Sequence, residues 1–157
     1  MRVVKRRRKQ GKTDYKGRAS LLKSGLARIA LRRSNKYFTA QYIKSDSAQD
    51  SIIIGVNSKS LLKYGWPENK KGGLKSKIAG YLTGFLLGRR VIDKEGKGVN
   101  AILDIGLRES IPKSRVYFFA KGLKEAGINL KVNENMLPEI KSEEINIEKI
   151  KKDIEKF

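Results

Sequence analysis

Residues 74–90 read LKSKIAGYLTGFLLGRR, and this stretch decides which fold the rest of the chain has to build. Its apolar side chains recur at helical spacing. Glycine stands at every fourth position, at Gly80, Gly84 and Gly88, although an interior glycine costs a helix up to ~1 kcal/mol relative to alanine. The glycines therefore predict a side-chain-free ridge on which a sheet or a second helix packs closely. The alternatives are a membrane-dimer role or a ligand role for the same ridge.

Downstream of this helix the sequence predicts a strand, a helix and a strand. Residues 101–106 form a mostly apolar run of strand length, as expected for a central strand covered on both faces. Ser114 is placed to cap a second helix that stops at Gly127. Residues 128–132 then alternate in polarity as a possible edge strand.

Upstream, three short segments predict an antiparallel meander. Residues 27–32 alternate small or apolar residues with basic ones, which predicts a half-buried strand with Arg28 and Arg32 on its open face. Residues 37–43 and 51–56 are rich in aromatic and β-branched residues and predict two further strands. The order β-β-β-α-β-α-β predicts an α/β domain, with a mixed sheet and helices on its faces. A short helix at residues 58–65 and an exposed, basic, flexible loop at residues 66–73 are expected in between.

A basic arm precedes this domain, where residues 5–18 read KRRRKQGKTDYKGR. The first 36 residues carry 14 Lys or Arg and one acid, Asp14, so they hold 13 of the chain's 20 net positive charges. Four consecutive cations cannot be buried without counter-charges, so the arm must face water or a polyanion. A polyanion is our interpretation. A solvated tail or an import signal is the alternative.

Composition excludes most enzyme classes and favours nucleic acid as the partner. A net charge of +20 and a pI near 10.2 attract phosphate-bearing partners. The chain has no Cys and no His, which removes disulfides, thiolate nucleophiles, imidazole bases and the usual zinc ligands. We expect no cofactor and no metal. The most apolar run, residues 78–87, is far shorter than the roughly 20 residues of a membrane helix, so no membrane association is expected.

The C-terminal segment predicts an amphipathic helix. Ser142, followed by two glutamates, can start it, and its apolar residues form a stripe: Ile147, Ile150, Ile154 and Phe157. Residues 141–157 carry five cations and five acids, so we expect this helix to dock on protein rather than RNA, on a neighbouring protein in preference to the body of the chain. The predicted organisation is a basic arm at residues 1–25, an α/β domain at 26–138 and a helical appendage at 139–157.

Several motifs, in this order and at this spacing, resemble the archaeal form of the large-subunit ribosomal protein eighteen family. They are KTDY at 12–15, RRSNK at 32–36, KYGW at 63–66, GYLTGFLLGRR at 80–90 and LDIGL at 103–107. The resemblance covers roughly residues 6–138; the C-terminal helix has no counterpart in the family pattern. It implies a ribonuclease-H-like topology without catalytic residues, and a structural role in the cytoplasmic ribosome. It also implies binding to 5S rRNA in the central protuberance, contacts with 23S rRNA and a neighbouring ribosomal protein, number five. We expect no homo-oligomer.

The expected RNA contacts combine the resemblance with the chemistry of the side chains. Cations neutralise phosphates, hydroxyl and amide groups reach phosphate or 2′-OH groups, and tyrosine stacks on an unpaired base or ribose. The set is Arg6, Arg7, Arg8, Lys9, Lys12, Thr13, Tyr15, Lys16, Arg18, Lys23, Arg28, Arg32, Arg33, Ser34, Asn35, Lys36, Lys70 and Lys71.

Two rival functions are weighed against the ribosomal one. A nuclease would need a cluster of carboxylates that holds two divalent metals. Asp104 is the only acid inside a convincing strand, and Asp46, Asp50 and Asp93 are interpreted as caps or solvated turn residues, so no catalytic residue is predicted. A free-standing RNA chaperone or a basic membrane-surface protein would share the charge but not the motif series.

Overall fold

A computed structural model describes residues 3–47, 49–140 and 147–156. Within them the chain forms a five-stranded mixed sheet with helices beside it, which confirms the predicted α/β class. The strands are β1 (Ala27–Arg33), β2 (Phe38–Asp46), β3 (Gln49–Asn57), β4 (Asn100–Asp104) and β5 (Asn129–Leu130). The helices are α1 (Arg6–Lys9), α2 (Tyr15–Lys23), α3 (Lys77–Glu95), α4 (Arg115–Ala126) and α5 (Ile147–Glu155), with 3-10 turns at η1 (Ser58–Tyr64), η2 (Glu68–Gly73) and η3 (Glu134–Met136).

The sheet has the strand order β3-β2-β1-β4-β5. The first three strands pair antiparallel, and β4 runs parallel to both β1 and β5. This confirms the predicted meander and the edge position of β5. Strand β4 lies inside the sheet between β1 and β5, but only Ala101 and Asp104 of its five residues are buried, so the expected cover on both faces is incomplete. The ribonuclease-H-like detail of the topology stays a prediction.

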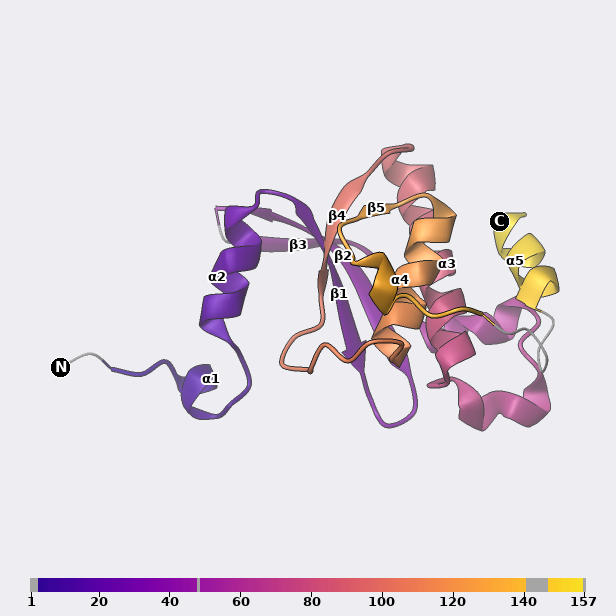
Figure 1. Ribbon diagram of the computed structural model, residues 1–157, viewed down its shortest axis with the longest axis horizontal. Helices are drawn as coiled ribbons and strands as arrows, with labels where there is room; N and C mark the ends of the chain where they lie inside the picture. Colours follow the sequence, from indigo (N-terminus) through magenta and orange to yellow (C-terminus); the bar gives the residue numbers. More distant parts are fainter. Residues whose placement is uncertain (1–2, 48, 141–146, 157) are drawn as a thin grey trace.

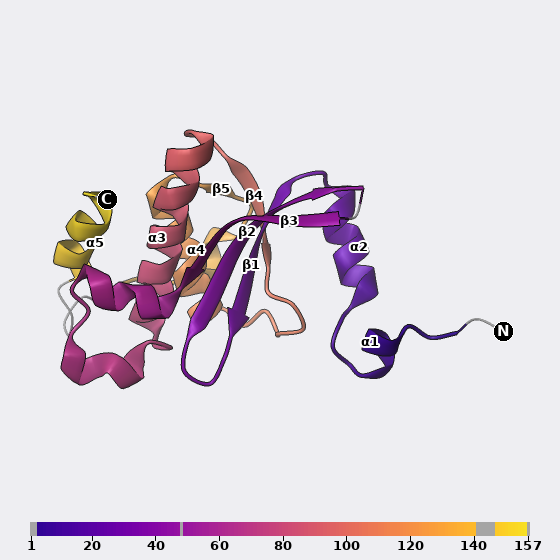
Figure 2. The same cartoon turned by 180° about the vertical axis from the view of Figure 1, so that it is seen from behind.

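The elements lie in layers across the molecule (Figure 1). Helices α3 and α4 cover one face of the sheet, α2 lies on the other side, and α5 lies outside α3; the reverse view shows the same order (Figure 2). In β1, Ile29 and Leu31 point into the core between the sheet and α3. Arg28 and Arg32 alternate with them and therefore lie on the face toward α2.

The glycine ridge of α3 packs against α4, which confirms the predicted close approach and identifies its partner as a helix. A Cβ at Gly84 would overlap the carbonyl oxygen of Phe119, and one at Gly88 would lie 2.5 Å from the Cβ of Ala126. Gly122 of α4 plays the reciprocal part, because a Cβ there would overlap the carbonyl oxygen of Tyr81. No larger residue fits at these points without moving backbone.

The loop between η1 and α3 differs from the expected exposed segment. Trp66 is buried, and its Nε1 donates a hydrogen bond to the carbonyl oxygen of Lys70 at 3.0 Å. The indole ring is large and apolar, so the loop folds back over it. Lys70 is half-buried and Lys71 is exposed. The expectation of a fully exposed loop is therefore wrong at Trp66.

Helix α5 is covered by the body of the chain. Ile147, Ile150 and Ile154 are all buried, and the helix packs on α3 and η1. Arg89 pairs with Glu155, and Lys151 pairs with Glu125 at 2.7 Å. The preference for a neighbouring protein as the cover of this stripe is therefore wrong. The expected start at Ser142 and the stripe residue Phe157 lie outside the described residues.

Candidate nucleic-acid interface

The arm folds into two short helices joined by a kink. Gly11 has a φ of +61°, which turns the chain between α1 and α2. Asp14 caps α2, because its Oδ1 accepts hydrogen bonds from the backbone N–H groups of Lys16 and Gly17 at 3.0 and 3.1 Å. Helix α2 ends at Ser24, and Gly25, at φ +65°, turns the chain into β1. A capping aspartate and two glycines thus fix where the arm bends, where α2 begins and where the chain turns into β1.

Two contacts arrange the side chains of the arm. The Nε of Arg7 donates a hydrogen bond to the Oγ1 of Thr13 at 2.9 Å. The Nζ of Lys5 lies 4.6 Å from the ring centre of Tyr15, a cation–π distance. Neither α1 nor α2 contains a buried residue, so the arm presents its polar groups to the surroundings.

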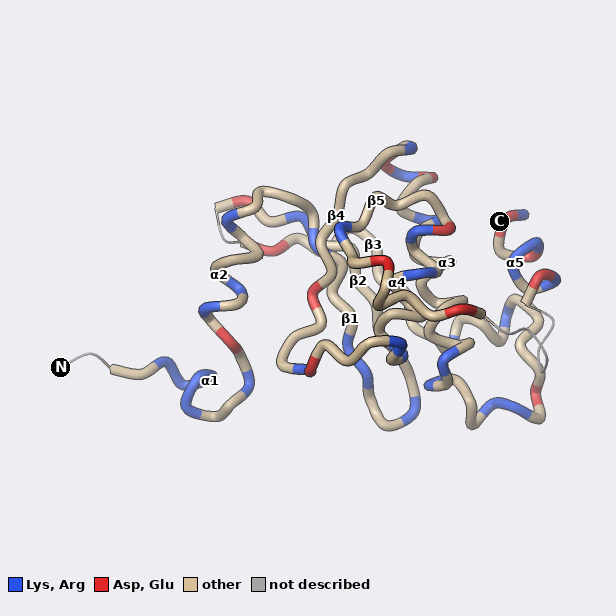
Figure 3. The backbone as a smooth tube through the Cα atoms, viewed as in Figure 1, with Lys and Arg blue, Asp and Glu red and all other residues tan. Residues whose placement is uncertain are grey.

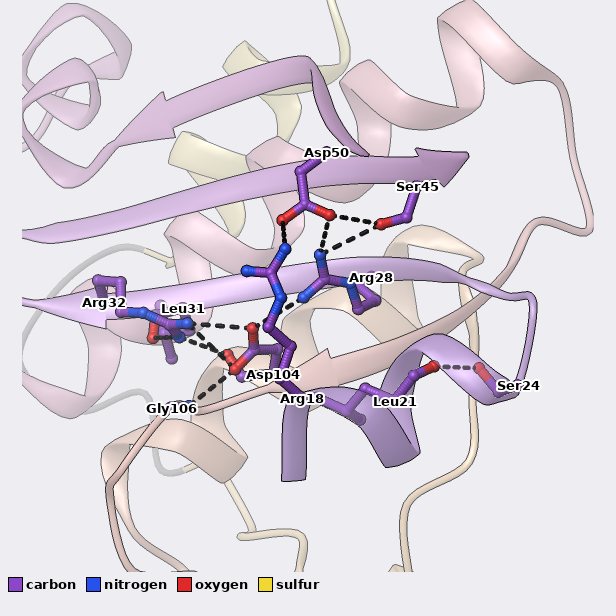
Figure 4. Close-up of polar contacts among 10 residues, drawn as sticks. All are labelled: Arg18, Leu21, Ser24, Arg28, Leu31, Arg32, Ser45, Asp50, Asp104 and Gly106. Atoms are coloured by element: carbon purple, nitrogen blue, oxygen red, sulfur yellow. Dashed lines mark hydrogen bonds and ion pairs between the residues drawn. The ribbon is translucent and has the colours of Figure 1, made fainter. Parts of the chain in front are cut away.

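An arginine network connects the arm to the sheet (Figure 4). Arg18 of α2 pairs with Asp50 at 2.7 Å, and Arg28 of β1 pairs with the same carboxylate at 2.6 Å. Asp104 of β4 accepts from Arg32 at 3.0 and 3.1 Å and from Arg28 at 3.4 Å. The two acids therefore hold three of the predicted RNA-binding arginines in fixed positions.

The environment of Asp50 keeps its carboxyl group ionised. Burial by itself raises the pKa of Asp50, but the hydrogen bond from Ser45 and the guanidinium groups of Arg28 and Arg18 outweigh burial, so the pKa is lowered. The expectation that Asp50 is a solvated turn residue is wrong, and Asp104 likewise serves as an ion-pair partner. Both acids bind arginine and are not free to bind a metal.

The predicted exposure of Arg28 is also wrong. Its side chain is 2% exposed, although it does lie on the face of the sheet that carries Arg32. Residues of α2 cover this part of the sheet, so an arginine on the open side of the strand is enclosed by the arm. Arg28 is an internal ion-pair residue.

The remaining predicted contacts are accessible. Thr13, Tyr15, Arg18 and Lys70 are half-buried, and the others are exposed: Arg6, Arg7, Arg8, Lys9, Lys12, Lys16, Lys23, Arg32, Arg33, Ser34, Asn35, Lys36 and Lys71. Ser34 is used within the β1–β2 turn, where its Oγ accepts from the N–H of Tyr37 at 2.9 Å.

The structure brings most of the predicted residues together and leaves two apart. A cleft of about 500 Å³ between the arm and the sheet is lined by Arg7, Lys12, Thr13, Arg18 and Arg32, among others. Lys70 and Lys71 sit in η2, on the far side of the molecule from the arm (Figure 1). Lys71 pairs with Glu68 at 2.9 Å.

Sequence reasoning missed further cations that gather at the start of α3 and α4. Lys77, Arg108 and Arg115 line a second cleft together with Arg33. These residues are spread over several segments and form no run in the sequence. Lys77, Arg108 and Arg115 become neighbours only because the loop between β4 and α4 brings the chain back beside the start of α3.

This site defines a class of protein: a nucleic-acid-binding α/β domain with a basic arm. Within the described ranges, no group of three or more acidic, His or Cys side chains is placed to hold a metal. In the same part of the chain, no helix has the length and apolar character needed to cross a membrane.

Comparison with known proteins narrows the class to one family. The family described as ribosomal large subunit proteins 60S L5 and 50S L18 matches residues 1–98. The chain is 40% identical to large ribosomal subunit protein uL18 of Methanothermobacter thermautotrophicus over 134 residues, covering 85% of this chain and 67% of that protein. It is 42% identical to the uL18 of Korarchaeum cryptofilum, with coverages of 88% and 68%. For Aeropyrum pernix the identity is 40%, with coverages of 87% and 62%.

The chain belongs to the uL18 family of large-subunit ribosomal proteins, in its archaeal form. It spans 62–68% of the length of these three relatives. Membership confirms the expected family, a structural ribosomal role rather than an enzymatic one, and the cytoplasmic ribosome as its location.

Proposed function

We propose that this chain binds 5S rRNA through its basic arm and the β1–β2 turn, and helps to attach 5S rRNA to 23S rRNA in the central protuberance. Its neighbours there would include other large-subunit proteins, among them ribosomal protein five. Family membership supports the ribosomal role, and the distribution of charge supports the RNA surface.

One observation carries the proposal. Every residue from 3 to 12 is exposed, and this segment holds six cations and no acid. The capped helix α2 and the pairing of Arg18 with Asp50 join this segment to the sheet. A charged segment whose described residues are all exposed, yet which is attached at a fixed point, is suited to follow a phosphate backbone.

The described contacts assign roles within this surface. Arg6, Arg8 and Lys9 are free to neutralise phosphates, because no carboxylate partner is found for them in the described ranges. The paired Arg7 and Thr13 present a guanidinium and a hydroxyl group side by side. We leave Arg28 out of the proposed RNA contacts because it is buried. Lys70 and Lys71 would contact RNA away from the arm.

Deleting residues 1–11 tests the proposal. We expect weaker binding to 5S rRNA and a flatter salt dependence, because each lost phosphate contact removes a slope of roughly 0.7–0.9 in log K against log salt. Thermal unfolding of the remaining domain should change little, because residues 3–11, the described part of the deleted segment, are all exposed. Unchanged affinity and slope would show that the arm is a solvated tail.

A second measurement separates the ribosomal role from that of a free-standing RNA chaperone. The tagged full chain should co-sediment with large ribosomal subunits in a gradient and resist a wash at moderate salt. A chain that remains in the free fractions while binding many RNAs equally would support the chaperone role instead.

A further inference from the structure

A second cleft, of about 580 Å³, lies at the end of β1, between the β4–α4 loop and the first turns of α3 and α4. Four cations line it: Arg33 of β1, Lys77 of α3, Arg108 of the loop and Arg115 of α4. Among the described residues that line it, Glu109 is the one acid. The cleft therefore carries an excess of three positive charges, and it lies outside the arm.

These four cations differ from the arginines of the network in the partners that the described residues give them. No carboxylate partner is found for any of them among residues 3–47, 49–140 and 147–156. The Nη2 of Arg108 donates to the backbone carbonyl of Arg33 at 3.4 Å, and the Nζ of Lys77 lies 5.6 Å from the ring centre of Phe118. Both contacts hold the side chains without cancelling their charge. Like charges gathered around one hollow repel each other until an anion enters it.

The start of α4 adds neutral donors to the same cleft. Ser114 occupies the N-cap position, as the sequence predicts, but its side chain accepts no capping hydrogen bond. Its Oγ is buried and has no hydrogen-bond partner within the described ranges. The first turn of α4 contains no acid, and the amides of a helix start point toward an anion in front of it. An unsatisfied hydroxyl group thus stands beside the four cations.

We propose that this cleft binds the phosphodiester backbone of an RNA strand, separately from the strand that follows the arm. The inference rests on the proposed RNA-binding function but assigns it to side chains outside that surface, apart from Arg33. Arginine and hydroxyl donors around a hollow match phosphate chemistry. Leu107 and Ile111, 58% and 56% exposed, stand on the rim, where a ribose or base would cover them.

Its position favours RNA over an acidic protein. The cleft begins at Arg33, and the exposed turn at residues 34–36 continues the basic surface away from it. Figure 3 shows basic segments on both sides of this turn, in the arm and at the start of α3 and α4. A single partner that contacts both basic segments must carry negative charge along its length, as the phosphate backbone of RNA does.

A charge-matched pair of variants tests the proposal in the full chain. Arg108→Gln/Arg115→Gln removes two cations from the cleft. Lys94→Gln/Lys97→Gln removes two exposed cations from the C-terminal end of α3 and the turn after it, at the other end of that helix. The probes are 5S and 23S rRNA transcripts from Methanothermobacter thermautotrophicus, titrated over a range of salt concentrations. Because both variants lose the same net charge, the difference between them measures local contact.

We expect the cleft variant to bind at least one transcript more weakly than the control variant does. For two lost phosphate contacts the slope of log K against log salt should fall by about 1.4–1.8. Ser114→Ala supplies a test without a change of charge: binding to the same transcript should weaken several-fold, while thermal stability stays equal or rises, because an unsatisfied buried hydroxyl group is removed.

The outcomes separate this proposal from the proposed function. If the cleft variant matches the control on both transcripts while deletion of residues 1–11 weakens 5S binding, the cleft proposal is overturned and the arm function stands. If 5S binding fails for the unmodified chain but the cleft variant loses 23S binding, the cleft proposal stands alone. Normal RNA binding combined with loss of a neighbouring protein from assembled subunits would make the cleft a protein interface and overturn the proposal.

Discussion

The contact between α3 and α4 and the contact between the arm and the sheet are built in opposite ways. Gly84 and Gly122 let the two helix backbones touch, so this contact depends mainly on the close packing of buried surfaces. The arm has no buried residue in its helices, and Arg18 joins it to Asp50 at a partly exposed ion pair. The first contact stabilises the fold. The second holds the proposed RNA-binding surface through an ion pair that is still accessible to solvent.

The largest expected loss of stability comes from a substitution that breaks the contact between α3 and α4. Gly84→Ala places a methyl group where the carbonyl of Phe119 lies, and should destabilise the protein by about 3 kcal/mol despite the better helix propensity of alanine. Gly72→Ala is the control, since nothing lies within 4 Å of its Cβ position, and it should change stability by at most about 0.5 kcal/mol. Equal urea midpoints for the two variants would contradict the close backbone contact.

A second test asks whether α5, like α4, is held on the body of the chain by buried apolar contacts. Ile150 is 2% exposed, so Ile150→Ala should cost about 2–4 kcal/mol. Lys152→Ala, on the exposed face of the same helix, should cost at most about 0.5 kcal/mol. Urea unfolding measures both variants. An Ile150→Ala variant as stable as the control would mean that the body does not cover the stripe in solution.

A third test concerns the polar network behind the arm. Asp104→Asn leaves the buried Arg28 with only Asp50 as a charged partner and should cost roughly 2–3 kcal/mol, at the low end for a broken pair because Arg32 is half exposed. Asp46→Asn removes the same charge where no ion pair is found in the described ranges. Similar thermal unfolding of the two variants would show that the network adds no stability.

The smallest effect concerns the attachment of the arm itself. The pKa of Asp50 is lowered, so the pairing with Arg18 should persist above the unfolded value of about 3.9 and be lost as the pH falls through the lower folded value. Arg18→Gln removes the arm's side of this pair, so it should remove this acid sensitivity and expose the arm to a protease several-fold faster at neutral pH. Lys16→Gln, which removes an exposed cation from the same helix, is the control. Each protease must be active at the pH of the measurement. Pepsin is therefore used in the acid range and trypsin in the neutral range. Identical cleavage of the two variants would show that the pair of Arg18 with Asp50 does not hold the arm.

The same contrast explains what could be read from the residues alone. Periodicity is local, so the order of strands and helices followed from residues 27–132, and the four-residue step of Gly80, Gly84 and Gly88 indicated a close contact. Charge along the chain indicated the arm. The family followed from motifs in order. The three-part division of the chain and the individual RNA contacts stay predictions.

Only the tertiary structure shows which residues the glycines of α3, the buried arginine and the two acids contact. Sequence spacing indicated that the glycines pack on something, but only the crossover of the chain places α4 and its Gly122 there. A strand pattern put Arg28 on the open face, and only the arm that folds over that face buries it. Asp50 and Asp104 meet arginines 22 and 76 residues away because strand register brings them together. Local sequence sets conformation and charge, whereas burial and pairing depend on contacts between distant segments, which no local pattern encodes.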